Sequence, residues 1–315
     1  MTAAATSVPV ALVVLNWNGK DDTLRCLASL DRASYRGLRV IVVDNGSTDG
    51  SSAAILEAHP GVELLRLASN RGYTGGNNAG IARALESDAE IIGVLNNDTV
   101  VDPGFLEPLV EQIEHDHMAY VSPRIVYLDE PDHAWFGGSY LDPKVGITYH
   151  QSEDAMSSAD RTATVRQTAA VTGCCLLAHR ELWERVGLFD DRYFLMFEDA
   201  DWCARAGKAG AHALVVTSSN VAHAVGASFR SHRSTIGDYY YLRNGLLYLR
   251  EHGDARIRCS MYLVGRVIRA SVRSFLRDPN LPHAQSAIAQ IEGATAFVLR
   301  RFGPRADRRR HAPST

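Results

Sequence analysis

The segment Val8–Gly19 reads VPVALVVLNWNG, and it opens with a short apolar run that lacks any polar residue. A run of this length without alternation is typical of a strand that is buried on both faces of a parallel sheet. The run stops at Asn16, where polar residues take over. We therefore predict a buried strand over Val8–Leu15 with a polar loop at its carboxyl end.

This pattern repeats along the N-terminal half of the chain. Further apolar runs that predict strands occupy Leu38–Val43, Val62–Leu67 and Ile91–Leu95. Stretches with helical spacing follow each run, from about Asp21 to Leu30, Ser51 to His59, Thr74 to Leu85 and Pro103 to His115. Such alternation predicts an α/β fold with a mostly parallel open sheet and helices on both faces.

Polar clusters follow three of these strands at their carboxyl ends. They are Asn16–Asn18, Asp44–Asp49 and Asn96–Asp98. Because ligands of open α/β sheets bind outside the carboxyl ends of the strands, we expect the three clusters to meet in one crevice. Carboxylates there suit a divalent cation, which often shares its oxygen ligands with substrate phosphates. The alternative for Asp98 is a simple cap of the following helix.

Composition excludes several classes of protein. The 315 residues are 46% hydrophobic and 22% charged, with a formal net charge of -3, which excludes collagen-like and disordered chains. No run of about 18 apolar residues occurs, so we expect no membrane-spanning helix, and Met1–Asn18 lacks the pattern of a signal peptide. The five cysteines form no C-x-x-C pair, which favours a reduced, cytoplasmic setting and argues against zinc.

The phosphate-binding and hydrolytic motifs that could explain such a crevice do not match. The position of a dinucleotide-binding G-x-G-x-x-G holds Asn16–Gly19, and Gly19-Lys20 lacks the upstream glycine of a P-loop. Neither H-E-x-x-H nor G-x-S-x-G occurs. The pattern therefore disfavours NAD enzymes, NTPases, zinc proteases and α/β-hydrolases.

The C-terminal part differs from the rest in pattern and in charge. Residues 123–168 contain many turn formers and predict an insertion or a mobile loop, whereas Ile236–Arg250, Ala255–Leu276 and Pro282–Arg301 predict helices. From Arg250 onward, 13 arginines oppose five acidic residues, a formal charge of +8, and the remainder carries 20 basic and 31 acidic residues, or -11. A basic stripe in the second helix is formed by Arg266, Arg269, Arg273 and Arg277. The stripe predicts either contact with an anionic membrane surface or a packed helix with a solvated basic face.

Five ordered motifs carry a resemblance to a known family. They are VVLNWNG at Val13–Gly19, VVDNGSTDGS at Val42–Ser51, NRGYTGGNNAGI at Asn70–Ile81, LNNDT at Leu95–Thr99 and FEDADWCARA at Phe197–Ala206. The chain resembles the family 2 inverting glycosyltransferases, in particular their rhamnosyltransferase-like branch, over roughly Val8 to Asn244. The resemblance implies the GT-A fold, a nucleotide-diphosphate sugar donor and Mg²⁺ or Mn²⁺. It places a glycosyltransferase domain in residues 1–232, with a nucleotide-binding half in 8–122 and an acceptor and catalytic half in 123–232, followed by a helical, arginine-rich extension in 233–315.

The resemblance also assigns the nucleotide and metal sites. It implies that Asp44 accepts a hydrogen bond from the nucleotide base and that Leu15, Asn16 and Asn18 line the nucleoside pocket. Asp98 matches the last acid of the metal-binding motif, and a histidine at the place of His223 often completes such a metal site. Here Asn96 and Asn97 stand where the family has acidic residues, so we expect weaker metal binding that depends more on the diphosphate.

The remaining assignments concern the sugar and the reaction. The resemblance makes Asp199 the base that deprotonates the acceptor and Glu198 a residue that positions it; the alternative for both is helix N-terminal charge. Cys174 lies in a small-residue segment that approaches the donor sugar. The backbone at Gly72, Gly75 and Asn77, with Arg71 beside it, is placed to meet a phosphate at a helix start. Trp135 falls where related enzymes have an acceptor-side loop.

Together these features predict a metal-dependent glycosyltransferase that moves a hexosyl or deoxyhexosyl unit, such as rhamnose. We expect a glycan or polyprenyl-diphosphate-linked acceptor, and a cytoplasmic protein on the inner face of the cell membrane. The alternatives are a soluble natural-product acceptor and a nucleotide-sugar-binding protein without turnover. Nucleic acid is not an expected partner, since aromatic residues do not interleave with the C-terminal arginines.

Overall fold

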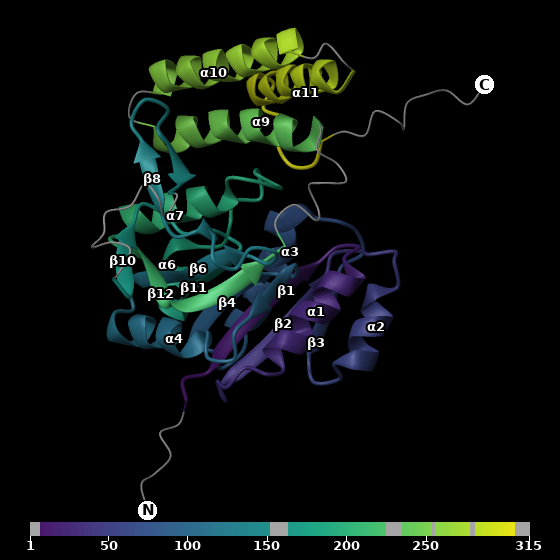
Figure 1. The fold of residues 1–315 in the computed structure, drawn as a ribbon, viewed down its shortest axis with the longest axis vertical. Helices are drawn as coiled ribbons and strands as arrows, with labels where there is room; N and C mark the ends of the chain where they lie inside the picture. Colours follow the sequence, from purple (N-terminus) through teal and green to yellow (C-terminus); the bar gives the residue numbers. More distant parts are fainter. Residues whose placement is uncertain (1–6, 152–162, 225–234, 254–255, 278–280, 306–315) are drawn as a thin grey trace, which may run out of the picture.

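A ten-stranded sheet runs through the molecule, and it is mostly parallel as predicted. The computed structural model describes residues 7–151, 163–224, 235–253, 256–277 and 281–305 (Figure 1). The strands along the main path are, in spatial order, β10 (Val165–Thr168), β12 (His212–His223), β6 (Ala119–Tyr127), β11 (Cys175–His179), β4 (Ile91–Asn96), β1 (Val10–Asn16), β2 (Leu38–Asp44) and β3 (Glu63–Arg66). Two of these eight strands, β10 and β11, run against the others.

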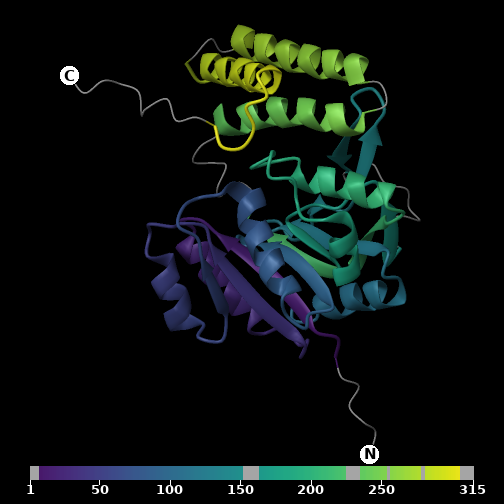
Figure 2. The same ribbon diagram turned by 180° about the vertical axis from the view of Figure 1, so that it is seen from behind.

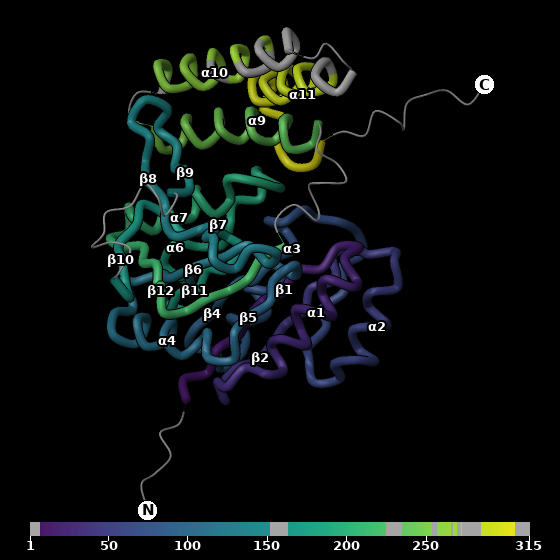
Figure 3. The backbone as a smooth tube through the Cα atoms, in the orientation of Figure 1, coloured from purple at the N-terminus to yellow at the C-terminus, as the bar shows by residue number. Residues whose placement is uncertain are grey.

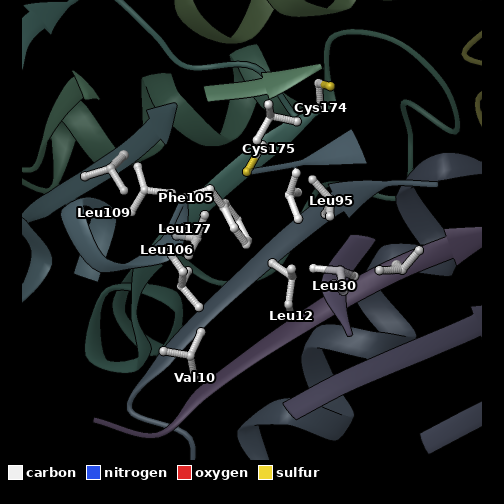
Figure 4. Close-up of a cluster of buried hydrophobic side chains, with 14 of the residues drawn as sticks. Val10, Leu12, Leu30, Leu95, Phe105, Leu106, Leu109, Cys174, Cys175 and Leu177 are labelled. Atoms are coloured by element: carbon white, nitrogen blue, oxygen red, sulfur yellow. The ribbon is translucent and has the colours of Figure 1, made fainter. Parts of the chain in front are cut away.

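Helices cover both faces of this sheet because the buried strands are apolar on both sides. Val10, Leu12 and Val14 of β1 pack with α1 (Lys20–Leu30), α2 (Ser51–Ala58) and α4 (Leu106–His115), as the cluster in Figure 4 illustrates. The alternate residues Ala11 and Val13 pack with α3 (Gly72–Leu85), α6 (Arg180–Val186) and α7 (Glu198–Lys208). Successive side chains of a strand point to opposite faces of the sheet, and helices cover both faces here. Consecutive residues of the buried strand are therefore apolar, which explains the continuous apolar run in the sequence.

The glycine-rich helix α3 lies unusually close to the sheet. A Cβ atom at Gly80 would lie 2.3 Å from Cγ1 of Val13 and 2.9 Å from Cγ2 of Val43. A Cβ atom at Gly76 would lie 2.4 Å from Cδ1 of Leu15. Helix α3 therefore needs glycine at these positions in order to reach β1 and β2.

Several short strands interrupt the segment 123–168, for which an insertion or a mobile loop was predicted. Strand β6 continues to Tyr127, and β7 (Ala134–Phe136), β8 (Ser139–Asp142), β9 (Ile147–His150) and β10 follow it. These strands are short and are interrupted by turn residues, so their pairing decides them rather than local pattern. Residues 152–162, which include most of the polar stretch, lie outside the described part.

Three C-terminal helices form a separate layer above the carboxyl ends of the strands (Figures 1–3). They are α9 (Thr235–His252), α10 (Arg256–Arg277) and α11 (Leu281–Val298). Leu247 of α9 belongs to one apolar cluster with Leu263 of α10 and Ile147 of the β8–β9 hairpin. Among the residues that the structure describes, no helix combines the length and apolar character needed to span a bilayer.

Candidate active site

A cavity of about 1210 Å³ opens at the carboxyl ends of the parallel strands. Its wall is built from Asn96–Asp98 beyond β4, the segment 170–174 before β11, the segment 194–200 around the start of α7, residues 147–150 of β9, and α9. Leu15, Trp17 and Asn45 also line it, so all three polar clusters contribute to or adjoin one crevice, as expected. The helical extension closes the same cavity through Tyr240, Tyr241 and Arg305.

Asp98 and His223 meet in this cavity because two strands pair that the sequence analysis did not anticipate. The short strand β5 (Thr99–Val101) follows Asp98 directly and pairs with the end of β12, where Thr99 lies opposite His223. The backbone N–H of Ala224 donates to the carbonyl of Asp98 at 2.9 Å. As a result Oδ1 of Asp98 lies 3.1 Å from Nε2 of His223, and both side chains are nearly buried.

This pair has the chemistry and the spacing of two cation ligands. Mg²⁺ and Mn²⁺ accept carboxylate oxygen and imidazole nitrogen, and two ligands each about 2.1 Å from one ion at a right angle lie about 3.0 Å apart. The observed 3.1 Å separation agrees with that value. Asn96 and Asn97 line the same wall, although the side-chain amide of Asn97 donates to Oγ1 of Thr23 at 2.8 Å.

An aromatic side chain orients this histidine. The ring of Trp135 lies edge-on to those of His223 and His150, with 4.7 Å between ring centroids in each pair. Trp135 and His150 both line the cavity. Desolvation of its ring lowers the pKa of His150 below its ordinary value, although the residue as a whole is exposed.

Glu198 and Asp199 stand at the first turn of α7, and both line the cavity. Oδ2 of Asp199 accepts from the backbone N–H of Gly173 at 2.9 Å, and Oδ1 accepts from that of Ala200 at 2.7 Å. Glu198 is buried, and Oε2 has no hydrogen-bond partner within the described ranges. Burial, and next the charge of Asp199, raise the pKa of Glu198 well above its usual range.

The side chain of Asn16 has a structural role, and the predicted contact of the backbone near Leu15 and Asn16 with a nucleoside stays a prediction. The Asn16 side chain is fully buried; the amide donates to Asp44, Ser47 and Ser51, and its oxygen accepts from the backbone N–H of Gly19. The amide thereby holds the loops after β1 and β2 together. Asp44 also accepts from Ser52 and is 5% exposed, so its role toward a nucleotide base stays a prediction.

The structure separates the other predicted donor-site residues. Leu15, Gly72 and Cys174 line the cavity, whereas Asn18, Arg71, Gly75 and Asn77 are not part of its wall. The amide of Asn77 donates to the carbonyl of Tyr73 in its own helix, and the oxygen of Asn18 accepts from the backbone of Thr48.

Two backbone N–H groups at the start of α3, where an anion site was predicted, have protein acceptors. The N–H of Gly72 donates to Oδ1 of Asn70 at 2.7 Å, and the N–H of Thr74 donates to the carbonyl of Phe194 at 3.2 Å. Burial raises the pKa of the Cys174 thiol well above its usual value, so Cys174 contributes a neutral small side chain.

Sequence reasoning missed a large apolar part of the wall. Phe194–Phe197 precedes the catalytic candidates, and Tyr149, Tyr240 and Tyr241 come from the hairpin and from α9. The clustering of aromatic residues at 239–241 was the available signal, but no local pattern connects residues so far apart in the chain.

The fold is the GT-A fold. The chain superposes on a mannosyltransferase from Pyrobaculum calidifontis, solved with GDP-Man and Mn²⁺, with a TM-score of 0.56 and 16% identity over 94% of this chain and 89% of the other. It superposes on GalNAc-T7, solved with UDP, GalNAc and Mn²⁺, with a TM-score of 0.58 and 15% identity over 81% and 54%.

Sequence comparison identifies the family. Residues 11–186 match glycosyl transferase family 2, and the chain belongs to that family. It is 30% identical over 223 residues to the N-acetylglucosaminyl-diphospho-decaprenol L-rhamnosyltransferase of Mycobacterium tuberculosis. The aligned region covers 63% of this chain and 70% of the relative. It is 22% identical over 248 residues to the dTDP-rhamnosyl transferase RfbF of Shigella flexneri, covering 76% and 79%. These relatives confirm the rhamnosyltransferase-like branch.

Proposed function

We propose that this chain transfers a deoxyhexosyl unit, rhamnose in the first instance, from a nucleotide-diphosphate sugar to a lipid-linked sugar acceptor in polysaccharide synthesis, with inversion. The observation that carries the proposal is that the Asp98–His223 pair and Asp199 line one cavity at the strand ends. Two relatives named as rhamnosyltransferases, one of them acting on a diphospho-decaprenol, favour the donor sugar and the acceptor class.

In this mechanism Asp98 and His223 would hold Mg²⁺ or Mn²⁺ at the cavity wall. When bound, the cation would neutralise the charge that develops on the departing diphosphate. Asp199 takes the proton of the acceptor hydroxyl as that oxygen attacks the anomeric carbon, so one displacement inverts the configuration. The backbone N–H groups of Gly173 and Ala200 fix the orientation of the Asp199 carboxylate. Glu198 forms a hydrogen bond with the substrate, which supplies the partner that Oε2 lacks among the described residues.

A screen of nucleotide sugars tests this function. Nucleoside diphosphate release is measured with Mn²⁺ and an N-acetylglucosaminyl-diphosphate polyprenol, and the anomeric configuration of the product is read by NMR. We expect acceptor-dependent release with dTDP-rhamnose and an inverted product. Retention of configuration would overturn the mechanism. Release that needs a soluble acceptor would redirect the proposal to natural-product chemistry, and binding without release would indicate a non-catalytic protein.

The outer face of α10 supports a place at the inner surface of the cell membrane. Ile257, Met261, Ile268 and Val272 are more than half exposed and recur at spacings of four, seven and four, which places them on one side of the helix. The exposed Arg258 and Arg269 flank this side; the side chains of Arg266, Arg273 and Arg277 lie outside the described part. An apolar stripe beside a basic one suits an anionic lipid surface.

Vesicle flotation tests this location. The chain should float with vesicles that contain phosphatidylglycerol and should remain below pure phosphatidylcholine vesicles. Ile268→Asp should abolish flotation, whereas Leu56→Asp on the exposed side of α2 should leave it unchanged. Equal flotation of Ile268→Asp and the wild type would contradict the membrane location.

A further inference from the structure

Helix α9 carries a pair of buried polar residues, Arg243 and Asn244, that bond to the backbone just before the catalytic candidates. Both side chains are 0% exposed. Nη2 of Arg243 donates to the carbonyls of Arg192 and Tyr193 at 3.0 and 2.7 Å. Nδ2 of Asn244 reaches the carbonyls of Tyr193, Leu195 and Met196 at 2.9, 2.8 and 2.8 Å. Four carbonyls of one short segment are thus bound by two neighbouring side chains.

The segment that these side chains bind has an unfavourable backbone conformation. Phe194, Met196 and Phe197 have φ values of 64°, 70° and 73°, in the left-handed region that bulky residues avoid. Such a conformation persists only where surrounding contacts impose it. The carbonyls of Arg192 and Tyr193 also accept backbone N–H groups, from Gly303 and Leu195, whereas for those of Leu195 and Met196 the amide of Asn244 is the donor that the structure shows among the described residues. The pair thus supplies side-chain contacts that hold this partly buried segment.

The Arg243 guanidinium donates its hydrogen bonds to backbone carbonyls and to Asn244. In the part of the chain that the structure describes, no carboxylate lies within salt-bridge distance of it. Its remaining donors go to the carbonyl of Gly303 and to Oδ1 of Asn244, at 2.5 and 2.8 Å. The rings of Tyr239 and Tyr240 lie 5.4 and 4.7 Å from Cζ, and the ring of Phe194 stacks on that of Tyr240. Arg243 therefore orients Asn244 as well as the segment.

The bound segment leads directly into the first turn of α7. Phe197 is the N-cap residue of that helix, and Glu198 and Asp199 follow it. A change in the backbone at Met196 or Phe197 would rotate this turn and break the 2.9 Å hydrogen bond from Gly173 to Asp199. The position of the Asp199 carboxylate in the cavity thus depends on the backbone that Arg243 and Asn244 fix.

We propose that Arg243 and Asn244 are positioning residues, which set the Asp199 carboxylate by holding the segment 193–197 in its left-handed conformation. The inference rests on the proposed function, in which Asp199 is the base. It makes the C-terminal helical layer part of the catalytic apparatus. The donor end of the cavity, at Asp98 and His223, lies on other elements and does not depend on this pair.

The variants Asn244→Ala and Arg243→Lys test the proposal. For each variant, steady-state kinetics give kcat and the donor KM, thermal unfolding gives the stability, and calorimetry with Mn²⁺ gives the affinity for nucleoside diphosphate. The alanine removes three carbonyl contacts, and the lysine keeps the charge but loses the planar fork. We expect kcat to fall at least roughly tenfold in each variant, while donor KM and nucleotide affinity stay within about twofold. The matched control is Arg180→Lys, because Arg180 binds the carbonyls of Leu85, Ser87 and Ala89 away from the cavity. It should leave kcat unchanged.

Three results would overturn the proposal. The first is a kcat within twofold of the wild type in folded variants. The second is a joint fall of kcat and nucleotide affinity that matches the loss of thermal stability. The third is failure of both variants to fold, since the pair would then stabilise the chain as a whole. A wild-type chain that transfers no sugar would instead count against the proposed function itself.

Discussion

Replacing Asp199 by asparagine separates its chemical role from its structural one, because the two side chains have the same shape. Both carboxylate oxygens accept a backbone N–H, from Gly173 and Ala200. In either orientation, the amide of asparagine points its NH₂ group at one of these donors, so one hydrogen bond is lost. The loss should cost about 1–3 kcal/mol of unfolding free energy. The second effect is on the reaction itself. Because asparagine cannot act as a general base, kcat should fall by a factor of about 10²–10⁴.

Two assays measure these effects independently. Urea unfolding gives the change in stability, and acceptor-dependent nucleotide release gives kcat, while calorimetry should show nucleotide binding close to that of the wild type. Asp116→Asn is the control, since Asp116 accepts a backbone N–H from Met118 at 2.8 Å outside the cavity wall. It should leave transfer intact. Transfer by Asp199→Asn above about a tenth of the wild-type rate would refute the assignment of the base.

Three further changes test the metal site, the buried acid and the packing of α3. Asp98→Ala should weaken Mn²⁺-dependent nucleotide binding by roughly ten- to a hundredfold in calorimetry, and an unchanged affinity would remove Asp98 from the site. The pKa of Glu198 is raised in the folded state, so the native chain binds a proton that the unfolded chain releases above about pH 4.3. The wild type should therefore lose stability relative to Glu198→Gln as the pH rises above about 4.3, and parallel stability curves would contradict this. Gly80→Ala should destabilise the fold by about 1–3 kcal/mol because its new methyl group meets Val13 and Val43, whereas Gly207→Ala, which meets no atom within 4 Å, should not; equal effects in urea unfolding would argue against the close helix–sheet contact.

The parallel half of the sheet could be predicted from the chain because its signals are local. Strands buried on both faces appear as continuous apolar runs, and the predicted ranges for β1, β2 and β4 agree with the observed ones to within two residues. The polar residues that stop those runs fall at one edge of the sheet for geometric reasons, so a crevice there followed from strand direction alone. Asp98 could be nominated in the same way, whereas Asp199 and His223 were nominated from the resemblance to family 2.

The strands β6 and β10 could not be predicted because their main partners are distant in the chain, whereas β8 and β9 pair with each other in a local hairpin. Strand β6 lies between β11 and β12, which are formed by residues more than fifty positions later. The turn residues between β7, β8 and β9 dominate the local pattern and suggest a loop. The energy that fixes β6 and β10 is non-local hydrogen bonding and packing, which no window of sequence contains.

By itself the chain determined the α/β fold, the edge of the sheet where the site lies and the residue types that can do its chemistry. Only the tertiary structure decided which of them meet. The pairing of β5 with β12 brings His223 to Asp98, and the packing of α9 places Arg243 and Asn244 against the segment that leads to Asp199. The physical reason is that apolar runs and strand ends are properties of neighbouring residues, whereas contacts between residues far apart in the chain exist only once the chain has folded and the entropy of closing the loops between them has been offset.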